Sequence, residues 1–288
     1  MNLLLQKTKI LERRKNKTNL KLFAKGFSNS LYTFHCQGNL YIYRKTTDPS
    51  LKIPKIYYYQ SLFKSFFSTH LLVLDNALIY PFIEGTPLNP YQMSVMEEEK
   101  AISSIGTKYK KIHNVTYSQY LYKGKKFGSW QDLFSYKMEE IQNLKNKHYI
   151  SKLKEQWANH FGEYKPKKRL LHGDFSPRNI IISDSTLKII DWDKFIVGDR
   201  FFELVNFLSK MFVRSHGNFE MSLIVNAFFS AYGWRYYSEL TKNKRLYLIY
   251  SLYFLIEMYS RCVMAKSHIR ARQYKNRIEY LFDKLRRM

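Results

Sequence analysis

The sequence is poor in cysteine, glycine and proline, and each shortage excludes a class of protein. Its two cysteines, Cys36 and Cys262, cannot build a disulfide framework or a cysteine-only zinc site. We therefore expect reduced thiols and a cytoplasmic protein. Only 11 glycines and 7 prolines among 288 residues exclude a collagen-like or low-complexity chain. Aromatic residues, at 17%, are plentiful, which excludes a disordered chain with little to bury.

Acidic residues are also scarce. The chain has 23 Asp and Glu against 48 Lys and Arg, which gives a formal net charge of +25. Such a charge favours contact with anions, nucleic acids and anionic membranes. The basic residues are spread along the chain, however, so we expect no dedicated nucleic-acid surface. Peripheral contact with an anionic membrane stays open, as does the oligomeric state.

No apolar run is long enough to cross a membrane. The longest, Leu246–Ile256, has 11 residues and stops at Glu257, whereas a spanning helix needs about 20. The first residues contain only the short apolar patch Leu3–Leu5, without the longer run and cleavage site of a signal peptide. The sequence thus predicts a globular protein that buries Leu246–Ile256 as a helix.

The hydrophobic pattern divides the chain into a β-rich part and a helical part. Strands are expected at Leu22–Ala24, Leu31–Cys36, Asn39–Thr46, Leu71–Leu74 and Ala77–Phe82, with a helix at Ile53–Phe67. Gly85, Pro87 and Pro90 mark a connector. Helices are then expected at Met93–His113, Ser129–Asn146, Ser151–Phe161, Phe201–Phe212, Phe219–Tyr232, Ser238–Lys266 and Ser267–Arg287. The prediction is an α+β protein with a small β-rich N-terminal lobe, residues 1–84, and a larger helical C-terminal lobe, residues 85–288.

Two short motifs flank a predicted β-hairpin. The first motif is His172-Gly-Asp-x-x-x-x-Asn179 and the second is Ile190-Asp-Trp-Asp193. Between them, the apolar runs Ile180–Ile182 and Leu187–Ile190 have the length of strands and are separated by the turn Ser183–Thr186. A hairpin brings the loop before its first strand close to the end of its second strand. We therefore expect the polar residues of the two motifs to converge.

Asp174, Asn179 and Asp191 are the chemically useful residues of these motifs. Carboxylate and amide oxygens are hard ligands that suit Mg²⁺ shared with the phosphates of a nucleotide. A carboxylate in this place could instead orient and deprotonate an attacking hydroxyl. An isolated Asp and Asn at this spacing could equally cap a turn, but the two motifs together favour the chemical role.

The two motifs resemble the signature of the aminoglycoside phosphotransferase and choline kinase superfamily, which are small-molecule kinases with a protein-kinase-like fold. The resemblance implies a bilobal fold, ATP and Mg²⁺ as cofactors, Asp174 as the catalytic base, and Asn179 and Asp191 as metal ligands. It also implies that His172 shapes the loop. The second motif, continued by Gly198-Asp-Arg-Phe-Phe-Glu-Leu204, is most similar to the choline, ethanolamine and thiamine kinase branch. No Gly-x-x-x-x-Gly-Lys-(Ser/Thr) loop is present, which argues against a P-loop kinase.

The resemblance extends into the N-terminal lobe. The segment Gly26-Phe-Ser-Asn29 resembles the family's nucleotide loop, which implies that Gly26 and Asn29 lie at the phosphates. Arg44 is implied as the cation that reaches the phosphates, with Lys45 as an alternative. Phe82 and Ile83 fit the family's interlobe hinge, whose backbone would bind the adenine.

One departure from the family concerns the partner of that cation. Kinase-like folds pair it with a Glu from the following helix, yet the sequence has no acidic residue between Pro49 and Leu74. Gln60 is the nearest candidate and would give a hydrogen bond without a charge. We therefore expect a phosphate anchor that is weaker or differently built.

The acceptor is expected to be a hydroxyl of a small molecule, by preference a choline- or thiamine-like alcohol. Such a cation needs aromatic faces or carboxylates near the attacking hydroxyl. The candidate carboxylates are Asp193, Glu203 and Glu257, and the candidate rings are Trp192, Phe195, Trp234, Tyr236, Tyr237 and Tyr253. Glu257 in an apolar helix needs a partner, either a bound cation or Arg261 four residues on. Two alternatives stay open: a kinase of an aminoglycoside or of a lipopolysaccharide or capsule sugar, and a non-catalytic kinase-like protein that binds an anionic partner.

Overall fold

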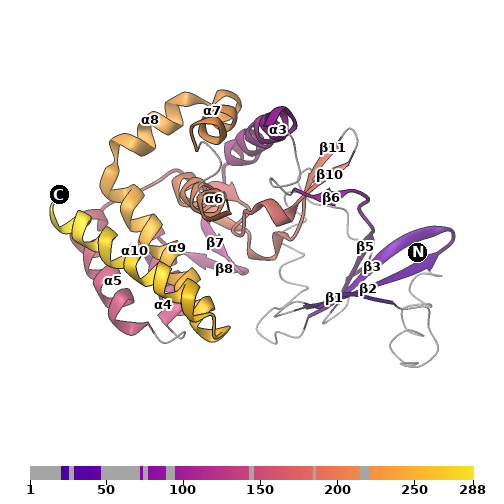
Figure 1. The fold of residues 1–288 in the computed structure, drawn as a ribbon, viewed down its shortest axis with the longest axis horizontal. Helices are drawn as coiled ribbons and strands as arrows, with labels where there is room; N and C mark the ends of the chain where they lie inside the picture. Colours follow the sequence, from indigo (N-terminus) through magenta and orange to yellow (C-terminus); the bar gives the residue numbers. More distant parts are fainter. Residues whose placement is uncertain are drawn as a thin grey trace. The chain divides into compact units, whose positions relative to one another are not determined.

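A computed structural model describes residues 21–25, 29–46, 72–73, 77–88, 95–142, 146–183, 186–214 and 221–288. The chain forms two compact units, whose elements are labelled in Figure 1. The first unit comprises Met1–Thr86 and Ile181–Asp193, and the second comprises Pro87–Ile180 and Lys194–Met288. The helix expected at Ile53–Phe67, including Gln60, lies outside the described residues.

The first unit is built on an antiparallel sheet with the strand order β1-β2-β3-β5-β4. The strands are β1 (Lys21–Lys25), β2 (Asn29–Cys36), β3 (Asn39–Thr46), β4 (Leu72–Val73) and β5 (Ala77–Pro81). Gln37 and Gly38 form the turn between β2 and β3, both at positive φ, as a tight hairpin requires. A buried hydrophobic cluster of this sheet consists of Phe34, Cys36, Tyr43, Ala77 and Ile79. All five predicted strands are confirmed in their described residues, which for the predicted strand Leu71–Leu74 are Leu72 and Val73.

A three-stranded sheet contains the hairpin predicted between the two motifs. Its order is β11-β10-β6, formed by β6 (Thr86–Pro87), β10 (Ile180–Ser183) and β11 (Thr186–Ile189). Gly85 precedes β6 with φ +131°, and a Cβ there would overlap the backbone of Ile182. Glycine is therefore required where the chain passes β10.

The second unit is mostly helical. Its helices are α3 (Val95–Asn114), α4 (Trp130–Gln142), α5 (Lys147–Phe161), α6 (Arg200–Arg214), α7 (Met221–Tyr232), α8 (Trp234–Lys242), α9 (Lys244–Met264) and α10 (His268–Arg286). A small sheet of order β8-β7-β12-β9 is formed by β7 (Tyr120–Tyr122), β8 (Lys125–Phe127), β9 (Arg169–Leu171) and β12 (Ile196–Gly198). Three of these strands, β7, β8 and β12, were not predicted, because three residues are too few to show an alternating pattern.

Two helix starts show how the local sequence sets the boundaries. Ser129 and Asp132 form a reciprocal capping box before α4, with N–H to side-chain oxygen distances of 3.1 Å in both directions. The single helix expected at Ser238–Lys266 is wrong. Asn243 accepts a hydrogen bond from the backbone N–H of Leu246 at 3.1 Å, so it caps α9 and separates this helix from α8.

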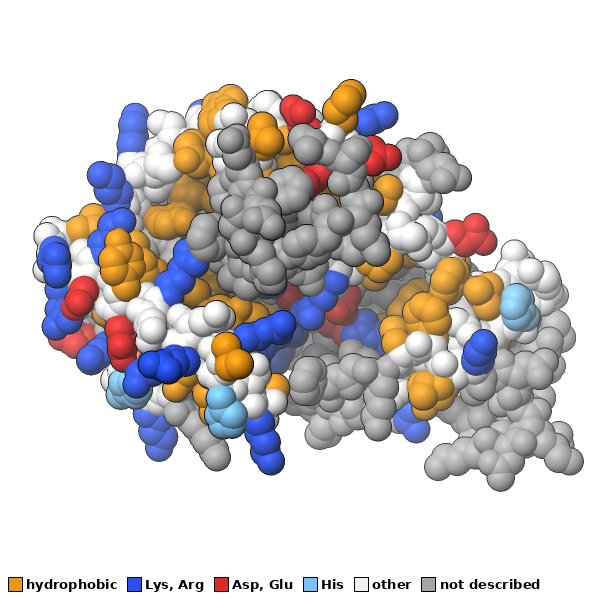
Figure 2. All heavy atoms as spheres, viewed as in Figure 1, with side chains coloured by type: hydrophobic (Ala, Val, Ile, Leu, Met, Phe, Trp, Pro, Cys, Tyr) orange, Lys and Arg blue, Asp and Glu red, His pale blue; other side chains and the backbone are white. Residues whose placement is uncertain are grey.

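The apolar segment Leu246–Ile256 lies in α9, where most of its side chains are buried, as predicted. None of the helices in the described part of the chain combines the length and apolarity that crossing a bilayer requires. Figure 2 shows Lys and Arg side chains at many places on the visible face of the helical unit. The predicted α+β class, with a small β-rich part and a larger helical part, is confirmed.

Candidate active site

The first motif lies in a loop, residues His172–Asn179, that we call the motif loop. It follows β9, whose residues Leu170 and Leu171 are fully buried. The chain turns at Gly173, which has φ +82°, and a Cβ on this residue would overlap the backbone carbonyl of Lys194. The motif loop therefore packs backbone to backbone at this point, which only glycine allows.

Glu203, in the first turn of α6, is hydrogen-bonded to the backbone of the motif loop. Its side chain is 1% exposed and accepts hydrogen bonds from the backbone N–H of His172 at 2.8 Å and of Gly173 at 2.6 Å. Nε2 of His113 lies 2.9 Å from the same carboxylate. Burial alone would raise the pKa of Glu203, but the contacts with His113 and His172 outweigh it and lower the pKa. The expectation that Glu203 could face a cationic substrate is wrong, because both of its carboxylate oxygens accept hydrogen bonds from the backbone of the motif loop.

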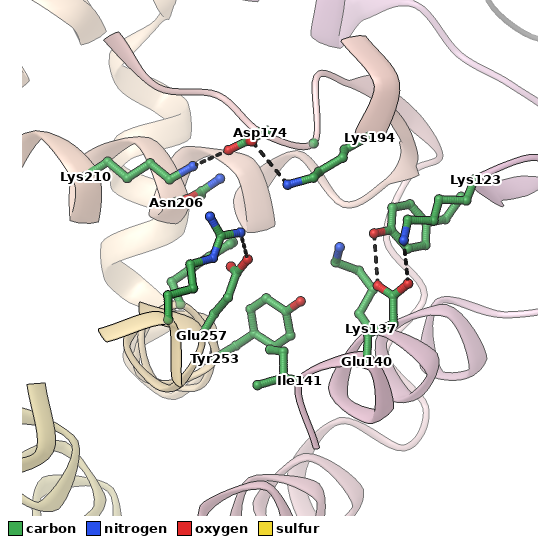
Figure 3. A pocket seen from close by; sticks show the side chains of 14 residues that line it. Lys123, Lys137, Glu140, Ile141, Asp174, Lys194, Asn206, Lys210, Tyr253 and Glu257 are labelled. Carbon is green, nitrogen blue, oxygen red and sulfur yellow. Dashed lines mark hydrogen bonds and ion pairs between the residues drawn. The ribbon is translucent and has the colours of Figure 1, made fainter. Parts of the chain in front are cut away.

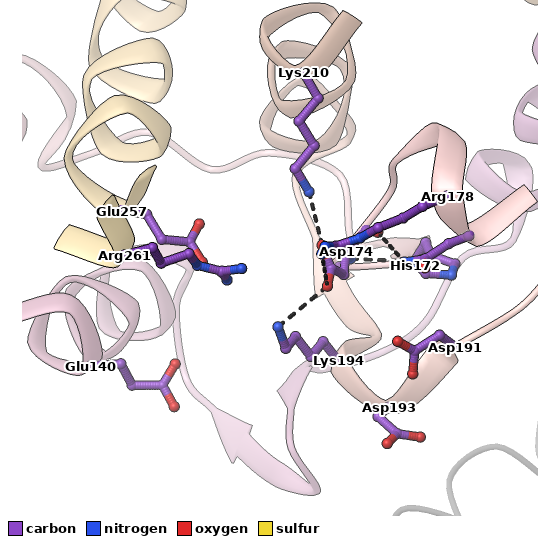
Figure 4. Close-up of polar contacts among 12 residues, drawn as sticks. Glu140, His172, Asp174, Arg178, Asp191, Asp193, Lys194, Lys210, Glu257 and Arg261 are labelled. Atoms are coloured by element: carbon purple, nitrogen blue, oxygen red, sulfur yellow. Dashed lines mark hydrogen bonds and ion pairs between the residues drawn. The ribbon is translucent and has the colours of Figure 1, made fainter. Parts of the chain in front are cut away.

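Asp174, the predicted base, is 7% exposed and surrounded by cations. Figure 4 shows Lys210 and Lys194 reaching it from different sides, with Nζ to carboxylate distances of 2.8 and 3.3 Å. Arg178 lies 3.7 Å away. Burial alone would raise the pKa of Asp174, but Lys210, Lys194 and Arg178 hold it well below its usual range. The carboxylate is therefore ionised and able to accept a hydrogen bond from a hydroxyl.

Asn179 ends the short 3₁₀ turn η2 (Pro177–Asn179) and is buried. Its side-chain nitrogen donates to the backbone carbonyl of Asp174 at 2.8 Å. This bond orients the amide so that its oxygen, the atom that suits Mg²⁺, remains for a cation. His172 accepts a hydrogen bond from the backbone N–H of Asp174 at 3.2 Å, in agreement with its implied role in shaping the loop. The structure thus brings Asp174 and Asn179 together in one braced loop.

Arg44 of β3 pairs with the carboxylates of the second motif. Its guanidinium lies 3.2 Å from Asp191 and donates two hydrogen bonds to Asp193, one of them at 3.1 Å. Burial alone would lower the pKa of Arg44, but Asp193 and Asp191 outweigh it and raise the pKa. Arg44 is buried, whereas Lys45 is exposed. Arg44 thus has two charged partners, Asp191 and Asp193, although the sequence offers no glutamate in the segment after β3.

Asp191 itself has an unusual backbone. It follows β11 with φ +65°, and its side chain is 43% exposed, in contrast to buried Arg44. A positive φ is uncommon for a residue with a Cβ and is more frequent for Asp and Asn than for most others. The carboxylate is thus held at the end of the hairpin in a position that remains accessible.

The other residues predicted to bind the nucleotide are placed as follows. Gly26 lies outside the described residues, and Asn29 begins β2. The backbone N–H of Phe82 donates to the carbonyl of Leu40 at 3.0 Å, which ties the segment after β5 to β3. Ile83 follows and is partly buried.

A pocket of about 330 Å³ lies beside Asp174 within the helical unit (Figure 3). Side chains of β7, α4, α6, α9 and the motif loop contribute to it. Its lining consists of Tyr122, Lys123, Lys137, Glu140, Ile141, Gly173, Asp174, Lys194, Asn206, Lys210, Tyr253, Phe254, Glu257 and Arg261. Five of these side chains are basic and three are carboxylates, so positive charge exceeds negative charge by two. The pocket offers room for a small molecule next to the predicted base.

In the part of the chain that the structure describes, no group of three or more His, Cys, Asp or Glu side chains is arranged to hold a metal ion. Mg²⁺ in phosphoryl-transfer sites is typically held by one or two carboxylates together with substrate phosphates and water. Asn179 in the motif loop and Asp191 after β11 each carry an oxygen atom of the kind that Mg²⁺ prefers.

A comparison with protein-family models gives a match over residues 40–240, to the model described as "Phosphotransferase enzyme family". The match covers more than half of the sequence. The chain belongs to this family. The predicted enzyme class, a small-molecule phosphotransferase, is thereby confirmed, as is membership of the wider aminoglycoside phosphotransferase superfamily.

Solved structures of aminoglycoside phosphotransferases share the fold. APH(4)-Ia is 16% identical with a TM-score of 0.67, covering 96% of this chain and 96% of its own. The GDP and kanamycin complex of APH(2")-IIia is 12% identical with a TM-score of 0.64, covering 97% and 99%. The gentamicin–APH(2")-IIa complex is 18% identical with a TM-score of 0.65, covering 94% and 95%. The predicted bilobal kinase-like fold is thus confirmed. Comparison with curated proteins gives no match.

Replacing Glu203 by glutamine is expected to loosen the motif loop. A glutamine offers one acceptor oxygen where the carboxylate offers two, and its NH₂ group would face a backbone N–H. We expect the free energy of unfolding to fall by about 1–3 kcal/mol, the cost of an unpaired buried donor, as measured by urea denaturation. The rate of phosphoryl transfer should fall as well, because the loop carries Asp174. The matched control is Glu155→Gln on the exposed face of α5, which should change neither quantity. Equal stabilities of the two variants would contradict the bracing role.

Proposed function

We propose that this protein transfers the terminal phosphoryl group of ATP to a hydroxyl group of a small molecule. The observation that carries the proposal is Asp174, a buried and ionised carboxylate in a braced loop at the edge of a pocket. Asp174 accepts a hydrogen bond from the acceptor hydroxyl and so orients the hydroxyl oxygen toward the terminal phosphorus of ATP. The new O–P bond forms as the bond to ADP breaks, and the hydroxyl proton passes to Asp174 and then to solvent. Because its pKa is low, Asp174 orients the hydroxyl rather than removing the proton early, as suits a loose transition state.

Asn179 and Asp191 would hold Mg²⁺, which when bound neutralises charge on the phosphates. Arg44 is the proposed phosphate contact. The remaining proposed nucleotide contacts are Gly26, Asn29, Phe82 and Ile83. Solved relatives with ADP, AMP-PNP or GDP support a nucleotide donor. ATP as donor and the free thiols of Cys36 and Cys262 suit a cytoplasmic protein.

The pocket lining disfavours the choline- or thiamine-like acceptor that the motifs suggest. Recognition of such a cation needs an open aromatic face or an unpaired carboxylate. Glu257 already pairs with Arg261, and Glu140 lies 2.9 Å from Lys123. The excess of positive charge in the pocket would further oppose a cation. The same argument applies to polycationic aminoglycosides, although the solved relatives include complexes with hygromycin B, kanamycin and gentamicin.

We therefore favour a sugar-like acceptor without positive charge, the class that includes lipopolysaccharide and capsule sugars. Asn206 of α6 supports this choice. Its side-chain oxygen is buried and forms no hydrogen bond within the described residues, and Asn206 lines the pocket. A buried acceptor of this kind requires a donor, which a further hydroxyl group of a sugar would supply.

The test is phosphoryl transfer by the purified protein. We expect ADP formation from ATP and Mg²⁺ that depends on a hydroxyl acceptor, measured over neutral, acidic and cationic compounds, with transfer abolished by a chelator. A phosphorylated product found by mass spectrometry would identify the acceptor class. Wild-type protein that neither binds AMP-PNP with Mg²⁺ nor consumes ATP would contradict the proposal and favour a non-catalytic binding role.

A further inference from the structure

Lys137 of α4 is a buried cation in the pocket beside Asp174. The residue is 6% exposed, and Figure 3 shows its side chain reaching toward the pocket. Within the described residues, no carboxylate lies at ion-pair distance from Lys137 and no acceptor forms a hydrogen bond with it. Buried ammonium groups are costly unless they are paired and hydrogen-bonded.

Three aromatic rings lie around the ammonium of Lys137. Its Nζ is 4.1 Å from the ring centre of Tyr122, 5.5 Å from that of Phe202 and 5.8 Å from that of Tyr253. Cation–π contacts compensate part of the lost hydration, but they supply no hydrogen-bond acceptor. Burial lowers the pKa of Lys137 to about 8, even though nearby carboxylates act in the opposite direction. The rings of Tyr122, Phe202 and Tyr253, which could otherwise contact a substrate cation, are thus occupied by the ammonium of Lys137.

The two glutamates of the pocket are engaged elsewhere. Glu140 accepts hydrogen bonds from Lys123 and from the hydroxyl of Tyr122, both at 2.9 Å. Glu257 pairs with Arg261, one turn further along α9. Neither carboxylate lies close enough to form an ion pair with Lys137. The positive charge of Lys137 is therefore available to a ligand in the pocket.

We propose that Lys137 binds an anionic group of the acceptor, a phosphate or a carboxylate, so that the enzyme acts on hydroxyl compounds that already carry negative charge. This inference rests on the proposed phosphotransferase function. Lys194 and Lys210 line the same pocket and add to its positive potential. An acceptor with its hydroxyl at Asp174 and an anionic group at Lys137 would supply the hydrogen-bond acceptor that the buried ammonium lacks.

The test measures anion binding with the nucleotide site saturated by AMP-PNP and Mg²⁺. The probes are inorganic phosphate, acetate and choline, titrated at constant ionic strength and followed by calorimetry. We expect phosphate or acetate to bind the wild type and choline not to bind. Tighter binding of phosphate indicates a phosphorylated acceptor, and tighter binding of acetate indicates a carboxylated one. Binding of choline, or of neither anion, would overturn the inference.

The variant Lys137→Met separates this pocket from the other basic surfaces. It should weaken binding of the anion at least tenfold, whereas Lys154→Met should leave it unchanged, since Lys154 lies on α5 outside the pocket and pairs with Glu139. Lys137→Met should also melt at or above the wild-type temperature, because it removes a buried charge, so misfolding would not explain the loss. Equal anion binding by both variants would overturn the assignment to Lys137. A wild type that binds AMP-PNP but no anion refutes only this inference, whereas one that binds no AMP-PNP refutes the proposed function.

Discussion

Replacing Asp174 by asparagine is expected to lower phosphoryl transfer about 10³-fold, within the range that general-base catalysis contributes. The two side chains have nearly the same size, but the amide carries no charge and cannot take up the hydroxyl proton. Nucleotide binding should be retained, because Asp174 is proposed to act on the acceptor. The measurements are ADP release with a saturating acceptor and the affinity for AMP-PNP with Mg²⁺. A variant with wild-type turnover would remove Asp174 from the mechanism.

The same substitution should also lower stability. The pKa of Asp174 is depressed in the folded protein, so its charge stabilises the fold above the carboxyl's unfolded pKa of about 3.9, and this contribution is lost as the pH falls through the folded value. At pH 7 we expect a loss of about 1–3 kcal/mol, because the partly exposed Lys210 and Lys194 lose their common hydrogen-bond partner. The difference from the wild type should shrink on acidification. The control is Asp283→Asn in an exposed pair with Arg286, which should change stability by less than about 0.5 kcal/mol.

Replacing Gly173 by alanine is expected to damage both stability and activity. At φ +82° a Cβ is strained, and here it would also overlap the backbone carbonyl of Lys194. The backbone at Lys194 must then move, together with the ammonium that contacts Asp174. We expect the free energy of unfolding to fall by more than about 3 kcal/mol. The kcat/KM of the folded fraction should fall about 10²-fold, the cost of a displacement near 1 Å.

Gly38 provides a matched control for this substitution. It has a similar φ of +76°, but a Cβ there would meet no atom within 4 Å. Gly38→Ala should therefore show the backbone strain alone, about 1 kcal/mol, with no change in turnover. Urea denaturation of Gly38→Ala and Gly173→Ala separates the cost of backbone strain from the cost of the steric overlap with Lys194. Equal losses at the two positions would contradict the close packing of the motif loop on Lys194.

The elements that the sequence predicted well are those built from local interactions. The strands at Leu31–Cys36 and Asn39–Thr46 depend on residues within a few positions of each other. Asp174 and Asn179 share one loop for the same reason. The helix predicted across Asn243 failed because hydrophobic periodicity continues through a residue that caps a new helix.

Other features depended on contacts between distant parts of the chain. Arg44 and Asp193 are 149 residues apart, so no local pattern could have paired them. Glu203 has the sequence context of an ordinary first-turn acid of a helix, which is favourable there in any case, and only the folded chain reveals that it binds the backbone of the motif loop.

The family and the fold class were predictable from the sequence, because they follow from motifs whose residues act within a single loop or hairpin, and the same motifs carry the proposal that Asp174 is the reactive carboxylate. The charge of the pocket beside Asp174, in contrast, became evident only in the folded chain. Lys137 is one basic residue among 48 in the sequence, and its meaning arises from burial beside rings contributed by three separate elements. Whether a charge is solvated or buried depends on what packs around it, and that is set by contacts across the whole helical unit.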